Sequence, residues 1–296
     1  MYERDWLADR FEEHRSNLRA VAYRMLGSLA EADDAVQEAW LRLSRADAKG
    51  VQNLGGWLTT VVGRVCLDML RSRGSRREEP LGAHVPDPIV SLGKRLDPEH
   101  EALLADSIGL ALLVVLQTLA PAERLAFVLH DMFDVPFHQI APILQRSPAA
   151  ARQLASRARR RVKGAAPVPD VDLARQQAVV GAFLAATRGG DFGALLAVLD
   201  PDVVARADAG AVPAGVSRVI RGASAVAEQA LAFAQRLGPF ARPALVNGAA
   251  GIVAARGGRP VSVLGFTVTR GKIMEIDILA DPERLSELDL AELGNG

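Results

Sequence analysis

The stretch SPAAARQLASRARRRVKG at 147–164 gathers six basic side chains and no acidic one. The whole chain holds 35 basic and 35 acidic residues, so its formal net charge is zero and this excess is local. Guanidinium groups pair with phosphate oxygens, and a local cluster of them indicates contact with a polyanion. A solvated basic helix on the protein surface is the alternative, and charge alone does not separate the two.

The residues around this cluster predict a helix-turn-helix. At helical spacing, small aliphatic side chains form one stripe and the cationic side chains fall largely elsewhere. Ser147 is a candidate N-cap, and Pro148 suits the first helical position. A short helix predicted over 137–144 comes before it, with a turn at 145–147. The second helix of such a unit enters the major groove of DNA, so the pattern favours DNA over a plain solvated helix.

Several side chains of this second helix have the chemistry to contact DNA. Gln153 can pair with adenine, Arg152 with guanine or phosphate, and Arg161 with phosphate. The predicted DNA-binding set is Ser147, Ala150, Arg152, Gln153, Ser156, Arg157, Arg159 and Arg160. Pro142 lies inside the preceding short helix, where it removes a hydrogen bond at a cost of about 3 kcal/mol. Either that helix begins late or the domain is less stable than most.

A second candidate surface lies on the helix predicted over 30–44. Its outward face at helical spacing consists of Asp34, Gln37, Glu38 and Leu41, with Asp33 next to them in sequence. An acidic and polar face with an exposed leucine suits a partner helix that bears arginines. An ordinary solvated helix face is the alternative.

A third set of side chains has the chemistry to hold opened DNA, which requires a cationic surface and groups that stack on bases or hold them. The set lies in the loop before the helix predicted over 56–72, on that helix and beyond it: Asn53, Trp57, Thr60, Arg64, Arg71, Arg73, Arg76 and Arg77. Trp57 could equally belong to the core. Cys66 lies close to the apolar stripe of this helix and is expected to be a buried small hydrophobe.

The chain divides into an all-helical front and an α+β back. Helices are predicted over 11–26, 30–44, 56–72, 98–119, 121–133, 137–144 and 148–163. Behind them, helices are predicted over 171–188, 191–199 and 224–237, with β-rich runs at 202–210, 242–248, 250–257, 261–271 and 272–280. The predicted domains are 1–79 and 98–164, both all-α, and 171–296, joined by linkers rich in proline and glycine at 80–97 and 165–170.

Composition excludes several classes of protein. The single cysteine cannot form an internal disulfide, which suits a reducing cytosol. The N-terminus is charged from its third residue and does not resemble a signal peptide, and no apolar run has membrane-spanning length. The five histidines are scattered without ligand spacing, so we expect no metal and no cofactor. These features predict a cytoplasmic protein without membrane contact.

The helical front resembles bacterial sigma factors. DDAVQEAWLRL at 33–43 is similar to region 2, which binds the β′ clamp helices of RNA polymerase. GWLTTVVGRVCLDMLRSRGSRREEPLG at 56–82 resembles the next segment, which opens and reads the minus-10 element. LAPAERLAFVLHDMFDVPFHQIAPILQRSPAAARQLASRARRRV at 119–162 resembles region 4, which reads the minus-35 element. The sequence between these segments is too short to hold the extra regions of primary sigma factors, so the chain resembles the extracytoplasmic-function type.

The back of the chain resembles the SnoaL-like cone domain that is fused to one subgroup of these factors. The likeness rests on RPALVNGAAGIV at 242–253 and VTRGKIMEIDILADPERL at 268–285. A glycine-rich DGGGK-like segment of the subgroup reads DAGAV here, and its terminal NPDKL-like motif reads DPERL. The resemblance implies regulatory contacts by Asp208, Gly210, Asp281, Pro282 and Leu285.

Taken together, these features predict a promoter-specificity subunit of bacterial RNA polymerase. The resemblance assigns core binding to the 33–41 face, minus-10 DNA to the 53–77 set and minus-35 DNA to the 147–160 set. The C-terminal domain would regulate activity in cis, with no catalytic residue and no separate anti-sigma factor.

Two rival functions stay open at this point. One is a ligand-responsive helix-turn-helix regulator with a small-molecule pocket in its C-terminal domain. The other is a cyclase-like enzyme, for which Arg206, Asp208 and Asp277 are candidate pocket residues. The 33–43 face and the 71–77 cluster discriminate, because a repressor needs neither.

Overall fold

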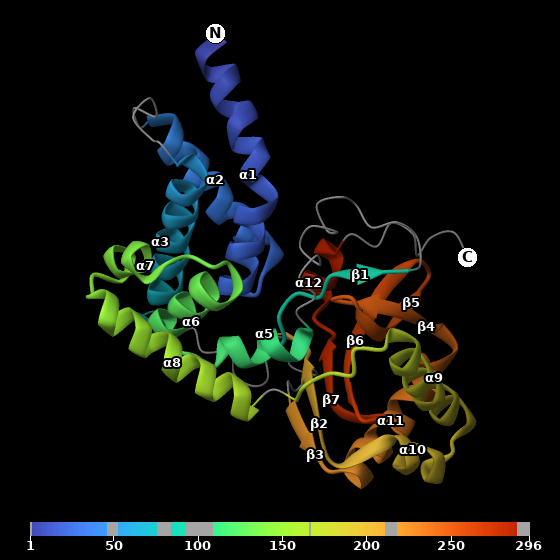
Figure 1. Ribbon diagram of the computed structural model, residues 1–296. Helices are drawn as coiled ribbons and strands as arrows, with labels where there is room; N and C mark the ends of the chain where they lie inside the picture. The colour runs from blue at the N-terminus through green and yellow to red at the C-terminus, as the bar shows by residue number, and fades with distance from the viewer. Residues whose placement is uncertain are drawn as a thin grey trace. The chain divides into compact units, whose positions relative to one another are not determined.

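The computed structural model describes residues 2–45, 53–75, 84–92, 109–165, 167–210 and 218–288 (Figure 1). The chain forms two compact units. The first, helical unit comprises residues 1–79, 98–106 and 115–166. The second unit comprises 80–97, 107–114 and 167–296 and contains the sheet. The expected division into an all-helical front and an α+β back is confirmed.

Three helices begin the helical unit: α1 (Tyr2–Leu26), α2 (Leu29–Arg45) and α3 (Leu54–Ser75). Gly27 ends α1 as expected, because its φ of +76° is a conformation that other residues rarely adopt. The shared core of the three helices is aliphatic and aromatic, and includes Phe11, Leu18, Val36, Leu43, Leu58 and Val62. Cys66 is fully buried, and this burial raises the pKa of its thiol to about 12, so it is the expected inert hydrophobe.

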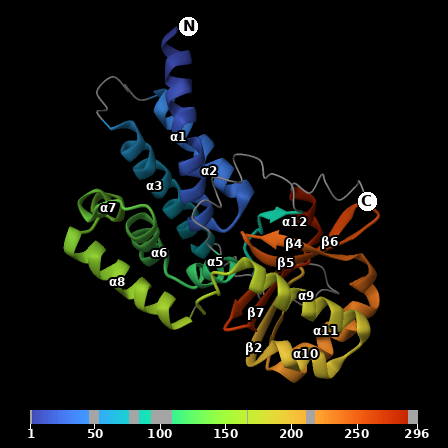
Figure 2. The same ribbon diagram turned by 45° about the vertical axis from the view of Figure 1, so that its right-hand side comes forward.

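The second half of this unit contains α6 (Pro121–Phe127), the π-helical turn η2 (Val128–Met132), α7 (Phe137–Leu144) and α8 (Pro148–Ala165). Before them, α5 spans Leu110–Gln117, and its residues up to Val114 belong to the second unit. α8 packs against α6 and α7 (Figure 2). The late start considered for α7 is wrong, because the helix begins at Phe137 and Pro142 lies in its second turn. Pro142 has no amide hydrogen to donate within the helix. Burial of Ile140, Ile143 and Leu144 stabilises α7 despite this lost hydrogen bond.

Within the helical unit, α3 packs directly against α6 and α7. Gly63 makes this close approach possible, because a Cβ there would lie 3.3 Å from methyl groups of both Leu125 and Leu129. Arg124 of α6 is buried, and its guanidinium donates to the carbonyls of Met25 at 2.8 Å and Gln117 at 2.7 Å. Burial lowers the pKa of Arg124 to about 10. A charged side chain therefore contributes to the junction between the two halves of the unit.

The second unit is built on a seven-stranded sheet in the order β1-β4-β5-β6-β7-β2-β3. Its strands are β1 (Val90–Ser91), β2 (Leu199–Asp208), β3 (Arg218–Arg221), β4 (Ala241–Val246), β5 (Ala249–Arg256), β6 (Arg259–Thr269) and β7 (Lys272–Leu279). Neighbouring strands are antiparallel except β2 and β7, which are parallel. A two-residue turn of Asn247 and Gly248, both with positive φ, joins β4 to β5.

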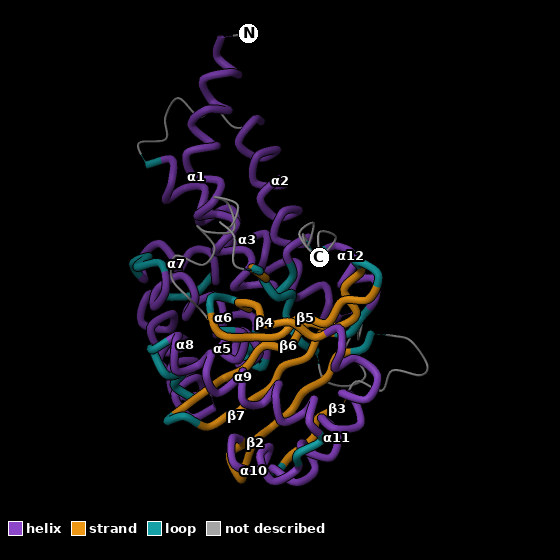
Figure 3. The backbone as a smooth tube through the Cα atoms, turned by 90° about the vertical axis from the view of Figure 1, so that its right-hand side faces the viewer, coloured by secondary structure: helices purple, strands orange, loops and turns teal. Residues whose placement is uncertain are grey.

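Helices cover one face of this curved sheet (Figure 3). They are α9 (Leu173–Gly189), α10 (Phe192–Val198) and α11 (Ala223–Leu237), followed by the short turn η3 (Gly238–Phe240). Their apolar sides and the inner face of the sheet form one core, in which Phe183 meets Phe266 edge-on at 5.2 Å between ring centroids. The last helix, α12 (Pro282–Glu287), follows β7. This arrangement is the α+β cone expected from the sequence.

The segment 84–92 departs from expectation, because it is not a loose linker along this stretch. Five consecutive residues from Val85 to Ile89 are buried within the second unit. Val90 and Ser91 then pair with β4 as edge strand β1. The proline-rich sequence gave no strand signal because a two-residue strand is set by its partner, not by its own periodicity.

A charged triad lies on the face of the sheet that does not meet α9 and α11. Arg206 of β2 donates to Asp277 at 3.1 Å and to Glu275 at 2.8 Å, both on β7. Asp277 is almost fully buried. Burial raises the pKa of its carboxyl to about 6, since the attraction of Arg206 is partly cancelled by the repulsion of Glu275.

We expect the triad to make the second unit lose stability as the pH rises from 4 to 6. A carboxyl whose folded pKa lies above its unfolded value near 4 binds its proton more tightly in the folded state, so stability is complete below pH 4 and falls above it. Two pKa units correspond to about 3 kcal/mol. Asp277→Asn should remove this dependence in denaturant unfolding at pH 4–7, followed by circular dichroism. Parallel pH profiles for the two proteins would contradict the assignment.

Candidate nucleic-acid and linker-binding sites

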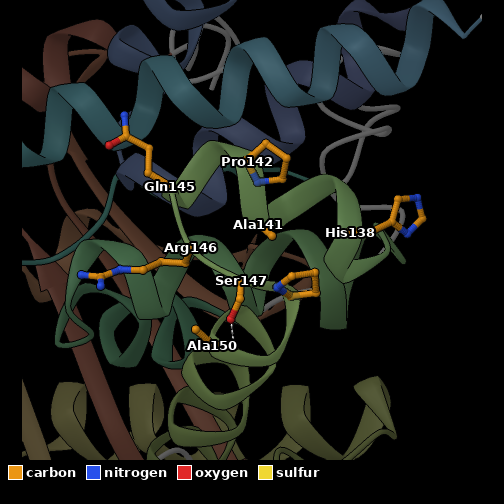
Figure 4. A pocket seen from close by; sticks show the side chains of 8 residues that line it. His138, Ala141, Pro142, Gln145, Arg146, Ser147 and Ala150 are labelled. Carbon is orange, nitrogen blue, oxygen red and sulfur yellow. Dashed lines mark hydrogen bonds between the residues drawn. The ribbon is translucent and has the colours of Figure 1, made fainter.

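The helix-turn-helix expected from the sequence is present in the helical unit. α7 ends at Leu144, and Gln145 after it has a φ of +53° that reverses the chain, while the Arg146 amide donates to the Ala141 carbonyl at 3.0 Å. Ser147 caps α8, since its Oγ accepts from the Ala150 amide at 3.2 Å (Figure 4). The turn and the two helix ends line a shallow groove. The N-cap prediction is confirmed.

α8 presents the predicted DNA-binding face to solvent. Its inward stripe of Ala151, Ala155 and Ala158 is fully buried against α6 and α7. Exposed side chains on the opposite side are Arg152, Gln153, Arg157 and Arg160, while Ala150 and Ser156 are half-buried. The alanines on the inner side let α8 lie close to its neighbours. The long cationic side chains lie outside this buried stripe.

Two arginines at the edges of this face pair with acidic residues of their own unit. Arg159 contacts Asp131 at 2.7 Å, and Arg161 contacts Glu123 at 3.0 Å. Arg152 lies over the ring of Phe137, 5.4 Å from its centroid. Like Arg152, Arg157 and Arg160 have no ion-pair partner within the described part of the chain, so these three arginines carry the uncompensated charge of the face.

The predicted face of α2 is also exposed. Asp34, Gln37 and Leu41 face solvent, while Ala32, Ala35, Val36, Ala39 and Leu43 form the buried side of the helix. Asp33 pairs with Arg19 of α1 at 2.6 Å. Glu38 pairs with Arg42 one turn later at 2.8 Å. Of the acidic groups on this face, Asp34 therefore has no ion-pair partner among the described residues.

The third predicted set falls largely on one side of α3. Four of its members recur at helical spacing along α3 and are exposed or half-buried: Trp57, Thr60, Arg64 and Arg71. Asn53 caps the helix, because its Oδ1 accepts from the Gly56 amide at 2.9 Å. Arg73 pairs with Glu31 of α2. Arg76 and Arg77 lie outside the described residues.

A separate cluster in the second unit holds the 84–92 segment. Arg284 of α12 donates to Asp87 at 2.8 Å, to Asp208 at 2.8 Å and to the Val85 carbonyl at 2.6 Å. Asp208 also accepts from the Val85 amide at 3.0 Å and lies 3.2 Å from His84 Nδ1. We call this set of contacts the linker latch.

A second clamp holds the segment a few residues further on. The Ile89 amide donates to the Asn247 side chain at 3.1 Å, and the Asn247 amide donates to the Ile89 carbonyl at 2.8 Å. Asn247 occupies the β4–β5 turn with a positive φ, so this turn forms the second clamp on the segment.

The regulatory residues inferred from the resemblance surround the latch. Asp281 caps α12 through the Glu283 amide at 2.9 Å, and Pro282 occupies the first helical turn. Leu285 is buried and anchors α12. Gly210 has a φ of +69°, and a Cβ there would overlap the Asp281 carboxylate. These four residues position Arg284, while Asp208 contacts the segment itself.

Asp208 is held ionised by its partners. Burial alone would raise the pKa of its carboxyl, but hydrogen bonds from His84 and from the amides of Val85 and Gly210, with the nearby charge of Arg284, lower it to about 2. The carboxylate is therefore charged at any pH near neutrality, and it attracts Arg284.

Sequence reasoning missed Arg284, Asp87 and Asn247, and it misplaced the pocket candidates. A cavity of about 520 Å³ lies between α9, α11 and the inner face of the sheet. Arg206, Asp208 and Asp277 do not line it, because alternation along β2 and β7 turns Ala205, Ala207, Ile276 and Ile278 inward instead. The described lining holds no Asp, Glu, His or Cys, so it offers no general acid or base.

Two known family models match the helical part of the chain. Sigma-70 region 2 matches residues 10–76, and Sigma-70 region 4 matches residues 109–162. The fold and the helix-turn-helix thus define a sigma factor, the initiation subunit of bacterial RNA polymerase. No helix of the described residues is long and apolar enough to cross a membrane.

Similarity to curated proteins covers the whole chain. The ECF RNA polymerase sigma factor SigJ of Mycobacterium tuberculosis is 40% identical, over 95% of this chain and 94% of that protein. The probable ECF sigma factor SigI of the same species is 36% identical over the full length of both chains. The crystal structure of SigJ superimposes with a TM-score of 0.77 and 37% identity, covering 96% of this chain and 99% of that one.

The chain therefore belongs to the extracytoplasmic-function (ECF) RNA polymerase sigma factors. Members of this family bind core polymerase and promoter DNA and are not enzymes, so the enzyme and stand-alone repressor alternatives fall away.

We expect Arg160 and Arg159 to differ in their contribution to DNA binding. Arg160→Ala should reduce the slope of log K against log salt by about 0.9, the value for one lost phosphate contact. Arg159→Ala should reduce it by less than half as much, because Asp131 already neutralises that side chain. Anisotropy titrations of the full-length protein with promoter DNA at several KCl concentrations measure both slopes. Asp131→Asn is the matched control and should strengthen binding; equal slope losses in the two arginine variants would contradict the distinction.

Proposed function

We propose that the three exposed faces divide the work of promoter recognition among them. The acidic face of α2 binds the β′ clamp helices of the polymerase, the α3 stripe holds minus-10 DNA, and the outward face of α8 reads minus-35 DNA. The observation that carries this proposal is the exposure of all three faces, each on a helix whose opposite side is buried. The proposal implies a cytoplasmic protein, because polymerase and promoter meet there.

Promoter binding requires a change within the helical unit. Elements about 25 base pairs apart are separated by about 85 Å along B-form DNA, at 3.4 Å per base pair. The α3 and α8 faces belong to one compact unit, joined by the Gly63 contact and by Arg124. A compact unit of about 140 residues has a radius of gyration of about 14 Å, so two of its faces cannot lie 85 Å apart. The two halves must therefore move apart on the promoter.

We further propose that the C-terminal domain regulates this movement in cis through the linker latch. The 84–92 segment joins the two halves of the helical unit along the chain, so holding it in the second unit limits the separations the halves can reach. Five buried residues and the Arg284 contacts make this hold specific. With its inhibitor on the same chain, the protein needs no separate anti-sigma factor.

The α2 face provides the first test. Asp34→Lys should weaken binding to core polymerase by about tenfold, because it places a cation against a surface expected to be basic. Biolayer interferometry with purified core enzyme measures the change. Asp9→Lys is the matched control, since Asp9 is an exposed acid on α1. Undiminished affinity in Asp34→Lys, with the salt dependence unaltered, would remove this face from the interface.

The latch provides the second test. Asp87→Ala removes the carboxylate on the linker and leaves the Arg284–Asp208 pair intact. We expect amide exchange at 85–91 to accelerate at least tenfold, and run-off transcription with core enzyme to rise several-fold because the halves separate more easily. Asp202→Ala, which removes an exposed carboxylate of the same unit, is the control. Faster exchange with unchanged transcription would show that the latch is structural only.

A further inference from the structure

We propose that the ring of Phe137 positions Arg152 to read a guanine in the minus-35 element, and that His130 of the π-helical turn η2 supports this ring. The inference rests on the proposed minus-35 role of α8 and goes beyond it. It assigns positioning residues that lie outside α8, and it names the base that one side chain selects. The contacts that carry it all lie within the helical unit.

Two stacked rings, which we call the aromatic platform, lie beside α8. His130 and Phe137 have 3.8 Å between their ring centroids and 35° between their planes. His130 Nδ1 donates to the Val135 carbonyl at 3.1 Å, since a carbonyl oxygen can only accept. Phe137 is the first residue of α7, so the helix fixes its backbone. The platform is therefore held from two elements, η2 and α7.

The guanidinium of Arg152 lies over the platform. It is 5.4 Å from the centroid of the Phe137 ring, and the side chain is otherwise exposed to solvent. A cation–π contact uses the charge of the guanidinium and leaves its N–H donors available for hydrogen bonds. It also restricts the rotamers of a long side chain, so less conformational freedom is lost when DNA binds. Arg152 is thereby prepared for a contact in which direction matters.

The other arginine that η2 contacts has a different partner. Asp131 follows His130 in η2 and pairs with Arg159, about two turns further along α8, at 2.7 Å. A carboxylate occupies the donors of a guanidinium and neutralises its charge, whereas an aromatic ring does neither. Arg152 therefore keeps both its charge and its donors on a fixed support, which favours base reading over simple attraction to phosphate.

The geometry of the guanidinium selects guanine among the four bases. Arg152 lies in the first half of α8, and the N-terminal part of a recognition helix is the part that contacts base edges. In the major groove guanine presents two acceptors, O6 and N7, which match two N–H donors of a guanidinium. Adenine presents one acceptor beside an amino group, thymine one acceptor beside a methyl group, and cytosine an amino group. A guanidinium held in one orientation therefore discriminates in favour of guanine.

The test measures base preference with holoenzyme reconstituted from core polymerase and the full-length chain. The probe is a pool of DNA duplexes in which the segment upstream of the start site is randomised. Sequencing of the bound duplexes gives the preference at each position as a ratio within one sample, which a partial loss of folded protein does not change. Any variant that folds in part therefore stays informative.

We expect the wild type to prefer guanine at one position by about 5- to 150-fold, and Arg152→Ala to lose this preference while others remain. Phe137→Leu should lower it by about 2- to 5-fold, since the cation–π contact is lost. Phe137→Tyr keeps a ring and should retain it. His130→Ala should lower it by less than Phe137→Leu does, because the ring stays and only its support is removed.

Phe133→Leu is the matched control. Phe133 is another half-buried aromatic residue of the same unit, and its ring lies 4.7 Å from the guanidinium of Arg24, not from α8. This variant should leave the profile unchanged. In the Arg152→Ala background, Phe137→Leu should have no further effect on the profile, because the side chain that the ring positions is gone.

The outcomes separate this inference from the proposed function. A guanine preference that survives Phe137→Leu but is lost in Arg152→Ala would overturn the positioning role of the ring. A profile that Arg152→Ala leaves unaltered would overturn the assignment of guanine and show a phosphate contact instead, with minus-35 binding by α8 intact. A wild-type holoenzyme without any upstream base preference would overturn the proposed minus-35 role and this inference with it.

Discussion

One half-buried arginine connects the linker with the rest of the second unit. Arg284 contacts one carboxylate on each side, Asp87 and Asp208, and only 19% of its side chain is exposed. A buried ion pair stabilises a fold only when hydrogen bonds satisfy the remaining lone pairs. Here the amides of Val85 and Gly210 complete Asp208. The position of the linker therefore depends on the geometry of α12, which its cap at Asp281 and its anchor at Leu285 fix.

The latch and the cavity lie on opposite sides of the same backbone. Along β2, Ala207 and Ala209 line the cavity and Asp208 between them reaches the linker. After β7, Ala280 lines the cavity and Asp281 caps α12. Alternation along these segments therefore separates the residues that hold the linker from those that line the cavity.

Periodicity in the sequence was sufficient for most elements and for the exposed faces. Amphipathic spacing located α2, α3 and α8, because each buries one stripe and leaves another in water. It failed for the latch, since Asp87 and Arg284 are far apart in sequence and neither carries a periodic signal. Pairing of Arg159 with Asp131 was equally invisible, because it depends on how α8 packs against η2. To predict the residues that line the cavity, one would need to know which face of each strand packs toward the helices.

The junction inside the helical unit combines apolar packing with a buried charge. Leu125 and Leu129 pack against Gly63, and the guanidinium of Arg124 donates to main-chain carbonyls. On separation, Arg124 regains water, which offsets part of the lost hydrogen bonding. In the proposed regulation, burial of the 85–89 segment acts on the same equilibrium, because a linker held on the sheet cannot extend. Release of that segment would then let the proposed minus-10 and minus-35 faces reach their separate sites.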